Sequence, residues 1–220
     1  MDLLLWQLAD SAFPSGGFAH SGGLEAAWHH GAVASVHDLK GYVCAAVRQA
    51  GHSALPFVTA AHANPRELAQ LDAFCDAFLT SPVSNRASRA QGRSFVMACS
   101  RAFRSQLLDD LRVSTHGESA ICGHYAPIFG ATLNALDVDR LVAQRLFLFL
   151  MSRTVTSAAV RLGLASTYEA QQLQAAVAPE IDRTVECCAV LRPADIAYTA
   201  PLIDLFQSTQ DRLYSRLFQS

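Results

Sequence analysis

Hydrophobic residues recur at intervals of three and four positions along most of the chain, a spacing typical of amphipathic helices. One such stretch begins after Ser35, a suitable N-cap residue with Asp38 as its capping-box partner. The apolar positions that share one face of this stretch are Val36, Leu39, Val43, Ala46, Val47 and Ala50. The pattern therefore predicts a helix with one buried side.

Capping residues, prolines and glycines mark further helix boundaries. The segments 64–67 (NPRE) and 166–169 (STYE) both place an N-cap residue three positions before a glutamate. Gly163 can end a long helix that starts near Asp139. Pro179 and Pro201 stand where further helices are expected to begin.

No alternating run of β-branched residues is long enough to predict a strand. At the usual helix length of about 11 residues, the pattern predicts an all-α fold, a bundle of about eight to ten helices. The length of 220 residues suits a single domain covering residues 1–220.

The clearest irregular segment is residues 11–23, SAFPSGGFAHSGG, which holds four glycines and a proline between two apolar stretches. Such a composition indicates a loop with demanding backbone geometry. Phe13 and Phe18 are the large apolar side chains of this loop, and we expect both to hold it against the core.

Composition excludes several classes of protein. Hydrophobic residues make up 51% of the chain and charged residues 16%, which excludes a disordered chain. The net charge of −2 gives no general attraction to nucleic acid or to an anionic membrane. The high mean hydropathy of +0.18 indicates more apolar surface than a monomer readily buries.

All but one of the 17 basic residues are arginine, the exception being Lys40. A phosphate-binding loop needs a lysine directly after a glycine-rich turn, and Lys40 follows Asp38 and Leu39 instead. Any GTP or ATP chemistry must therefore come from a partner. The start of the chain lacks a basic region, so no signal peptide is predicted and its six cysteines are expected to be reduced thiols in the cytoplasm.

Five arginines and no acidic residue lie within residues 81–108. If one helix continues through Gly92, they form a stripe about 120° wide, suited to an acidic protein surface or to phosphates. The stripe consists of Arg86, Arg89, Arg93, Arg101 and Arg104. The alternative is a solvated face, or arginines paired with acidic residues elsewhere in the fold.

The tightest group of potential metal ligands is His116, Cys122 and His124, which would serve a rival function as a helical metalloenzyme. Their spacing does not place two ligands on one helix face, and the set is not a complete coordination shell. We therefore predict no permanent metal site, no bound cofactor and no catalytic residues. A transient or intersubunit ligand role stays open.

The C-terminal stretch is apolar almost to its last residue, although chain ends usually fray unless they are docked. Its large hydrophobic residues are Leu205, Phe206, Leu213, Tyr214, Leu217 and Phe218. Either this tail packs on its own bundle or it becomes ordered against another chain. The apolar surplus of the whole sequence favours another chain.

Five segments together resemble the UreF family of urease accessory proteins from one end of the chain to the other. They are residues 14–25 (PSGGFAHSGGLE), 87–94 (ASRAQGRS), 123–130 (GHYAPIFG), 158–163 (AAVRLG) and 216–220 (RLFQS). The family-motif residues are Pro14, Gly16, Gly17, Phe18, Ser21, Gly23, Leu24, Glu25, Gln91, Gly92, Gly123, His124, Gly130, Arg161 and Gly163. Each segment alone is a weak signal, but five in this order are specific.

The resemblance implies an all-α, non-enzymatic adaptor that forms a homodimer, binds UreD (UreH in some systems) and recruits the GTPase UreG. The assembly would deliver nickel to apo-urease, with nickel handled transiently. The family match implies that Arg216, Leu217, Phe218 and Ser220 contact UreD/UreH. Arg86, Arg89 and Arg93 are our candidates for contact with UreG, either as a docking surface or as a source of an arginine finger that activates GTP hydrolysis.

Overall fold

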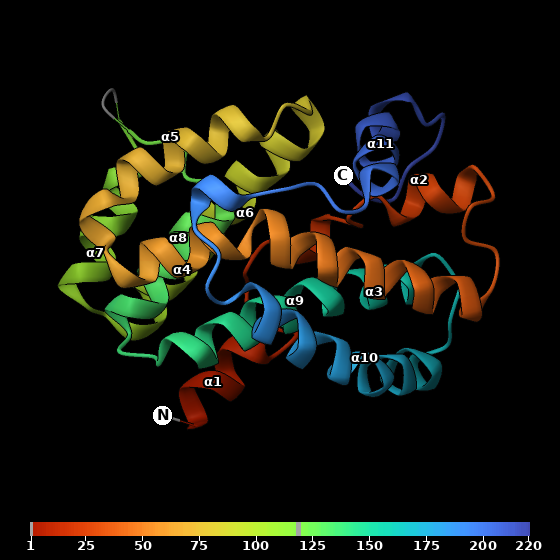
Figure 1. The fold of residues 1–220 in the computed structure, drawn as a ribbon, viewed down its shortest axis with the longest axis horizontal. Helices are drawn as coiled ribbons and strands as arrows, with labels where there is room; N and C mark the ends of the chain where they lie inside the picture. Colours follow the sequence, from red (N-terminus) through yellow and green to blue (C-terminus); the bar gives the residue numbers. More distant parts are fainter. Residues whose placement is uncertain (1, 118–119) are drawn as a thin grey trace.

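The computed structural model describes residues 2–117 and 120–220 (Figure 1). Within these ranges the chain forms eleven α-helices and four short 3-10 helices and contains no strand, which confirms the all-α prediction. The α-helices are α1 (Asp2–Ala9), α2 (Leu24–His29), α3 (Val36–Ser53), α4 (Leu55–Ala63), α5 (Leu68–Phe78), α6 (Pro82–Phe103), α7 (Gln106–Ser114), α8 (Tyr125–Ala135), α9 (Arg140–Arg161), α10 (Thr167–Cys188) and α11 (Pro201–Thr209). The 3-10 helices are η1 (Gly17–Ala19), η2 (Pro65–Glu67), η3 (Pro193–Asp195) and η4 (Gln210–Arg212).

Most of the predicted helix boundaries are found where capping chemistry placed them. The Ser35 hydroxyl accepts the Asp38 N–H at 3.2 Å, and the Asp139 carboxylate accepts the N–H groups that begin α9. Ser166 and Glu169 form a complete capping box at the start of α10. Gly163, with φ of 73°, adopts the left-handed conformation that closes α9.

Two predicted boundaries differ from the structure. The segment after Asn64 forms the 3-10 turn η2 before α5 begins at Leu68, because the Asn64 amide donates to the Glu67 carboxylate instead of capping the backbone. Pro179 lies inside α10 and does not start a helix. Val177 and Ile181 on either side of it are buried in the core, and this packing keeps the helix continuous despite the missing N–H.

Helix α9 runs through the centre of the molecule and packs against α3, α4, α8 and α10. In Figure 1, α3, α9 and α10 lie side by side, with α5 and α7 towards one end and α2 and α11 towards the other. Aromatic side chains from α6, α8 and α9 form the centre of the core, with ring centroids 5.0 to 5.7 Å apart; they are Phe95, Tyr125, Phe129 and Phe147. Most buried hydrophobic residues of the described chain form one continuous cluster.

The close crossing of α4 and α8 depends on Gly130. A Cβ atom at this position would lie 2.2 Å from the carbonyl oxygen of Val58, so no larger residue fits without moving a helix. The described helices include none whose length and apolar content would suffice for crossing a lipid bilayer.

Candidate functional site

The glycine-rich loop, residues 11–23, requires several of its glycines. Gly16, Gly22 and Gly23 have φ values of 78°, 62° and 82°, in the left-handed region that side chains disfavour. A Cβ atom on Gly23 would also lie 2.9 Å from the Tyr42 hydroxyl and 3.0 Å from the backbone of α11. Gly23 therefore lets α11 pack directly against the start of α2.

The two phenylalanines of this loop have different environments. Phe13 is buried against Phe95 and Phe103, as predicted. Phe18 is 72% exposed, so the expectation that it packs into the core is wrong. Its ring instead covers the guanidinium group of Arg161, whose carbon lies 3.9 Å from the ring centroid.

The tail, residues 213–220, folds back onto this loop. Its last carbonyl group, that of Ser220, accepts hydrogen bonds from the Ser21 backbone N–H at 2.5 Å and the Ser21 hydroxyl at 2.9 Å. The Ser220 hydroxyl lies 2.7 Å from Nδ1 of His20, and the Gln219 N–H donates to the carbonyl of Ala19 at 2.8 Å. These contacts join segments almost 200 residues apart.

Glu25 is the main polar anchor of the tail. Its buried carboxylate accepts the backbone N–H of Leu217 at 2.6 Å and that of Phe218 at 3.2 Å. The side-chain amide of Gln210 donates to the same carboxylate. A buried carboxylate needs several donors to be tolerated, and here the donors come from the tail and from η4 just before it.

Arg161 completes the docking of the tail. Its guanidinium group lies between two aromatic rings, 3.9 Å from the centroid of Phe18 and 4.2 Å from that of Phe218. It also donates to the Phe18 carbonyl at 2.5 Å. Three of the five motif segments, residues 14–25, 158–163 and 216–220, thus meet around Arg161.

The tail therefore takes the first of the two predicted alternatives, packing on its own bundle. Phe218 and Ser220 are buried, so the preference for another chain is wrong for these two side chains. Buried hydrogen-bond donors and acceptors on α2 and its preceding loop give the tail a ready partner within the chain. Leu217 remains 60% exposed and Arg216 is exposed, and their partner-binding role stays a prediction.

The arginine stripe lies on α6, which does continue through Gly92. Arg86 forms an ion pair with Asp211 at 3.0 Å, and Asp211 also binds Arg216 of the tail. Arg89 lies 4.0 Å from Asp76. Both arginines are thus paired with acidic residues of the same chain.

The other three stripe arginines differ from one another. Nε of Arg93 is buried and has no hydrogen-bond partner among the described residues, and Arg101 is exposed. Arg104 does not belong to the stripe, because α6 ends at Phe103 and Arg104 has a φ of 45°. The last arginine of the stripe is therefore Arg101.

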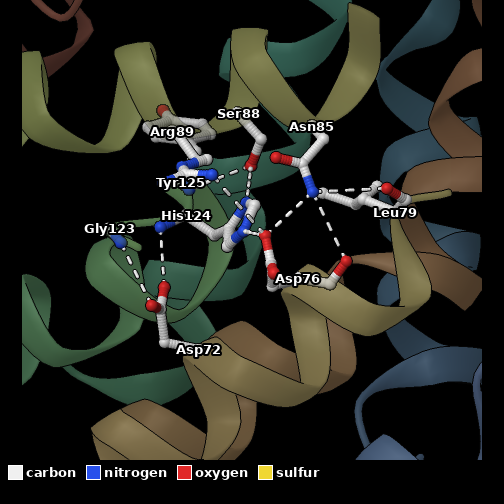
Figure 2. Close-up of polar contacts among 9 residues, drawn as sticks. All are labelled: Asp72, Asp76, Leu79, Asn85, Ser88, Arg89, Gly123, His124 and Tyr125. Carbon is white, nitrogen blue, oxygen red and sulfur yellow. Dashed lines mark hydrogen bonds and ion pairs between the residues drawn. The ribbon is translucent and has the colours of Figure 1, made fainter. Parts of the chain in front are cut away.

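The loop before α8 packs tightly on α6 at Gly92. A Cβ atom there would lie 2.2 Å from the carbonyl oxygen of Gly123, so the two motif glycines allow direct backbone contact. The carboxylate of Asp72 on α5 accepts the N–H groups of Gly123 and His124 at 3.1 and 2.7 Å (Figure 2). These bonds fix the loop and satisfy donors at the N-terminus of α8.

His124 is fully buried at this position, with both ring nitrogens engaged (Figure 2). Nδ1 lies 3.2 Å from the Ser88 hydroxyl and Nε2 lies 3.0 Å from a carboxylate oxygen of Asp76. Burial lowers the pKa of His124, although the hydrogen bond with Asp76 opposes this effect. Hydrogen bonds from Asn85 and His124 lower the pKa of Asp76.

Of the three potential metal ligands that the sequence suggested for the rival function, His116 does not lie with the other two. His116 is exposed and bonds to the Arg112 carbonyl through Nδ1. In the described part of the chain one group of potential ligands gathers within 4.8 Å, and it consists of Asp76, Cys122 and His124. Asp76 was missed because it lies on α5, 46 residues before Cys122, and carries no local spacing signal.

Other motif residues support this arrangement. Ser21 and Leu24 are fully buried. Gly17 is closely packed, because a Cβ atom on it would lie 3.3 Å from both the Gln91 amide and the Thr154 hydroxyl. Pro14 is exposed at the start of the turn. The motif residues thus lie mainly where loops contact helices, and few of their side chains are exposed to solvent.

Comparisons with known proteins agree with the motifs. The UreF family model matches residues 33–178. A urease accessory protein F of rice (Oryza sativa subsp. indica) is 37% identical over 97% of this chain and 83% of its own length. That of Arabidopsis thaliana is 36% identical over 98% and 91%, and a urease accessory protein UreF of Mycobacterium sp. (strain JLS) is 30% identical over 98% and 97%. The chain belongs to the UreF family of urease accessory proteins.

Proposed function

We propose that this protein is a non-enzymatic adaptor of urease maturation. In this proposal it forms a homodimer, binds UreD/UreH and recruits the GTPase UreG, so that the assembly delivers nickel to apo-urease. Family membership supports a place in urease maturation. The individual partners come from the resemblance of the motifs described above.

The observation that carries the adaptor proposal is an exposed apolar surface on α11 and the tail. Leu202 and Leu205 of α11 and Tyr214 and Leu217 of the tail are all more than half exposed. The buried contacts of Glu25 hold the tail in an ordered form that can present these side chains. An ordered apolar patch of this kind is typical of a protein–protein contact.

The chemistry of the chain supports a role without catalysis of its own. Its single lysine, Lys40, is exposed within helix α3 and follows no glycine-rich turn. GTP hydrolysis in the assembly is therefore assigned to UreG. All six cysteines are unpaired, which suits the reducing cytoplasm.

The arginine-finger alternative has less support. A finger residue must reach into the partner's site, whereas Arg86 and Arg89 bind Asp211 and Asp76 within this chain. Single Arg86→Ala, Arg89→Ala and Arg93→Ala variants that all bind UreG without changing its GTP turnover would dispose of this alternative.

Light scattering on purified components tests the adaptor proposal. The chain is mixed with UreD/UreH, and then with UreG loaded with GTP or GDP. We expect a complex whose mass corresponds to two copies of each protein. A chain that ignores both partners would overturn the proposal.

A pair of substitutions locates the contact. Leu217→Asp should abolish binding of UreD/UreH, because it places a charge in the apolar patch. Leu107→Asp is the matched control, since Leu107 is similarly exposed at 61% but lies on α7, towards the opposite end of the molecule (Figure 1). Equal binding by both variants would exclude the tail as the contact.

A further inference from the structure

Asp76, Cys122 and His124 bring a carboxylate oxygen, a thiol sulfur and an imidazole nitrogen within 4.8 Å of one another. We propose that these three side chains bind one divalent transition-metal ion of the Ni²⁺ and Zn²⁺ class. The proposal takes up the transient ligand role that the sequence left open and does not require a permanently bound metal. It uses His124 and Cys122 of the trio suggested by the sequence, with Asp76 in the place of His116.

The donor set selects the class of ion. Ca²⁺ and Mg²⁺ prefer oxygen ligands alone, whereas sulfur together with imidazole nitrogen suits Zn²⁺, Ni²⁺ and similar ions. A thiolate and a carboxylate together would balance the charge of a divalent cation, so the three ligands and the bound ion would carry no net charge. The thiol proton of Cys122 would be released to water when the ion binds.

Two of the three ligands, Asp76 and His124, have further hydrogen-bond partners (Figure 2). Asn85 donates to the Asp76 carboxylate at 2.9 Å, and the Ser88 hydroxyl lies 3.2 Å from Nδ1 of His124. Nδ1 can donate to Ser88 when Nε2 binds an ion, because the neutral ring carries a single hydrogen that either nitrogen can hold. Such outer contacts orient ligands and are typical of protein metal sites.

The geometry also allows a metal ion to enter the site and to leave it again. His124 is fully buried, but the Asp76 side chain is 40% exposed and Cys122 is partly exposed, so an ion can enter from solvent. Three protein ligands leave at least one coordination position open for water or for a ligand from another molecule. An open position favours exchange over permanent retention.

Arg89 is a nearby group that opposes a cation. Its guanidinium group lies 4.0 Å from Asp76, and its side chain is 41% exposed. A partly exposed arginine can move aside into solvent at little cost, because exposed ion pairs of this kind contribute about 1 kcal/mol or less. Arg89→Gln is therefore expected to strengthen metal binding.

The identity of the natural ion rests on the proposed function. A protein that takes part in nickel delivery would meet Ni²⁺, and an exchangeable three-ligand site would hold it in transit. The binding itself stands on the three side chains alone, whatever the partners do.

Cobalt absorption spectroscopy tests the site on the full-length chain, prepared metal-free under reducing conditions. Co²⁺ is the probe, because a cobalt–thiolate bond gives a sulfur-to-metal charge-transfer band in the near ultraviolet. We expect one Co²⁺ per chain with this band, and displacement of Co²⁺ by Ni²⁺ or Zn²⁺. Asp76→Asn should weaken binding at least tenfold, because removing even an outer hydrogen-bond partner of a metal ligand typically costs about tenfold or more.

Cysteine variants assign the sulfur. Cys122→Ser should lose the band, whereas Cys187→Ser, which removes an exposed thiol on α10, should keep it. Far-ultraviolet circular dichroism verifies that both variants are folded. If Cys122→Ser does not fold, the loss of Co²⁺ affinity in Asp76→Asn tests the site instead. No band in the parent chain, or a band that survives Cys122→Ser, would overturn the proposal. Light scattering with UreD/UreH is a separate measurement that reports on partner binding and not on metal. A missing metal site is therefore distinguishable from a failed adaptor function.

Discussion

At the scale of single residues, the absence of a side chain at Gly92 determines how closely α6 approaches the loop before α8. The backbone carbonyl of Gly123 occupies the space that a Cβ atom on Gly92 would need. This contact places Ser88 of α6 next to His124, so the polar network of Figure 2 depends on it. Packing of this density does not absorb an added methyl group without a shift of backbone.

Gly92→Ala is therefore expected to destabilise the protein by about 3 kcal/mol or more, at the upper end of the range for overpacked cores. Gly41→Ala is the matched control, because Gly41 is also helical but has open space around it. Alanine there should stabilise the protein by about 0.5–1 kcal/mol. Denaturant unfolding measures both, and equal effects of the two substitutions would contradict the packing argument.

His20 makes stability depend on pH. Burial, and to a smaller extent the charge of Arg86, lowers the pKa of His20 below 6.5. The unfolded chain thus takes up a proton that the folded chain resists, so the stability present above about pH 6.5 decreases as the pH falls through the folded pKa. The pKa of His124 is also lowered, so this residue likewise makes the protein less stable as the pH falls.

His20→Gln should consequently reduce, without abolishing, the loss of unfolding free energy between pH 7 and pH 5. Denaturant unfolding at a series of pH values gives the slope for the parent and the variant. An identical slope in the two proteins would mean that His20 does not contribute to this dependence.

At the scale of elements, α10 shows tertiary packing overriding a local signal. A proline usually begins or breaks a helix, yet α10 continues for 22 residues with Pro179 inside it. The buried positions of α10 pack against α3 and α9 on both sides of the proline. The helix is therefore maintained by its apolar face at the cost of one backbone hydrogen bond.

Pro179→Ala should restore that hydrogen bond and stabilise the protein by about 1–3 kcal/mol, because alanine is favoured over proline by about 3 kcal/mol in a helix interior. Pro201→Ala is the control. Pro201 is the first residue of α11, where a missing N–H costs nothing. Thermal unfolding of the two variants should show a gain at position 179 alone; a gain of similar size at both would contradict this reasoning.

At the scale of the whole molecule, the α2 region and the tail act as one unit despite their distance in the sequence. Glu25 and the tail amides lie 192 and 193 residues apart along the chain. Arg161 on α9 adds a third contribution by contacting Phe18 and Phe218. The ordered form of the tail therefore depends on parts of the chain that local helix formation does not bring together.

Glu25→Gln should release the tail while leaving the helices intact, because an amide offers one acceptor oxygen where the carboxylate offers two. Limited trypsin digestion followed by mass spectrometry should show faster cleavage after Arg216. Glu186→Gln, at an exposed position on α10, is expected to leave the cleavage rate unchanged. Cleavage at the parent rate in Glu25→Gln would show that this carboxylate does not hold the tail.

The sequence was sufficient for features that depend on neighbouring residues. Capping by Ser35, Asp139 and Ser166 placed three helix starts, and the glycines of the loop 11–23 indicated its irregular backbone. Contacts between distant segments left no local pattern. The docking of the tail on Glu25 and the meeting of Asp76 with His124 both belong to this class.

The separation between Ser21 and Ser220 has a consequence for folding kinetics. Contacts that close a loop of about 200 residues form after local helices have packed, since the loop-closure entropy must first be offset by other contacts. The tail is accordingly expected to dock late during folding and to open early under stress. A chain with an incomplete core would then lack the ordered apolar surface of α11 and the tail, so, under the adaptor proposal, only correctly folded molecules would compete for the partners.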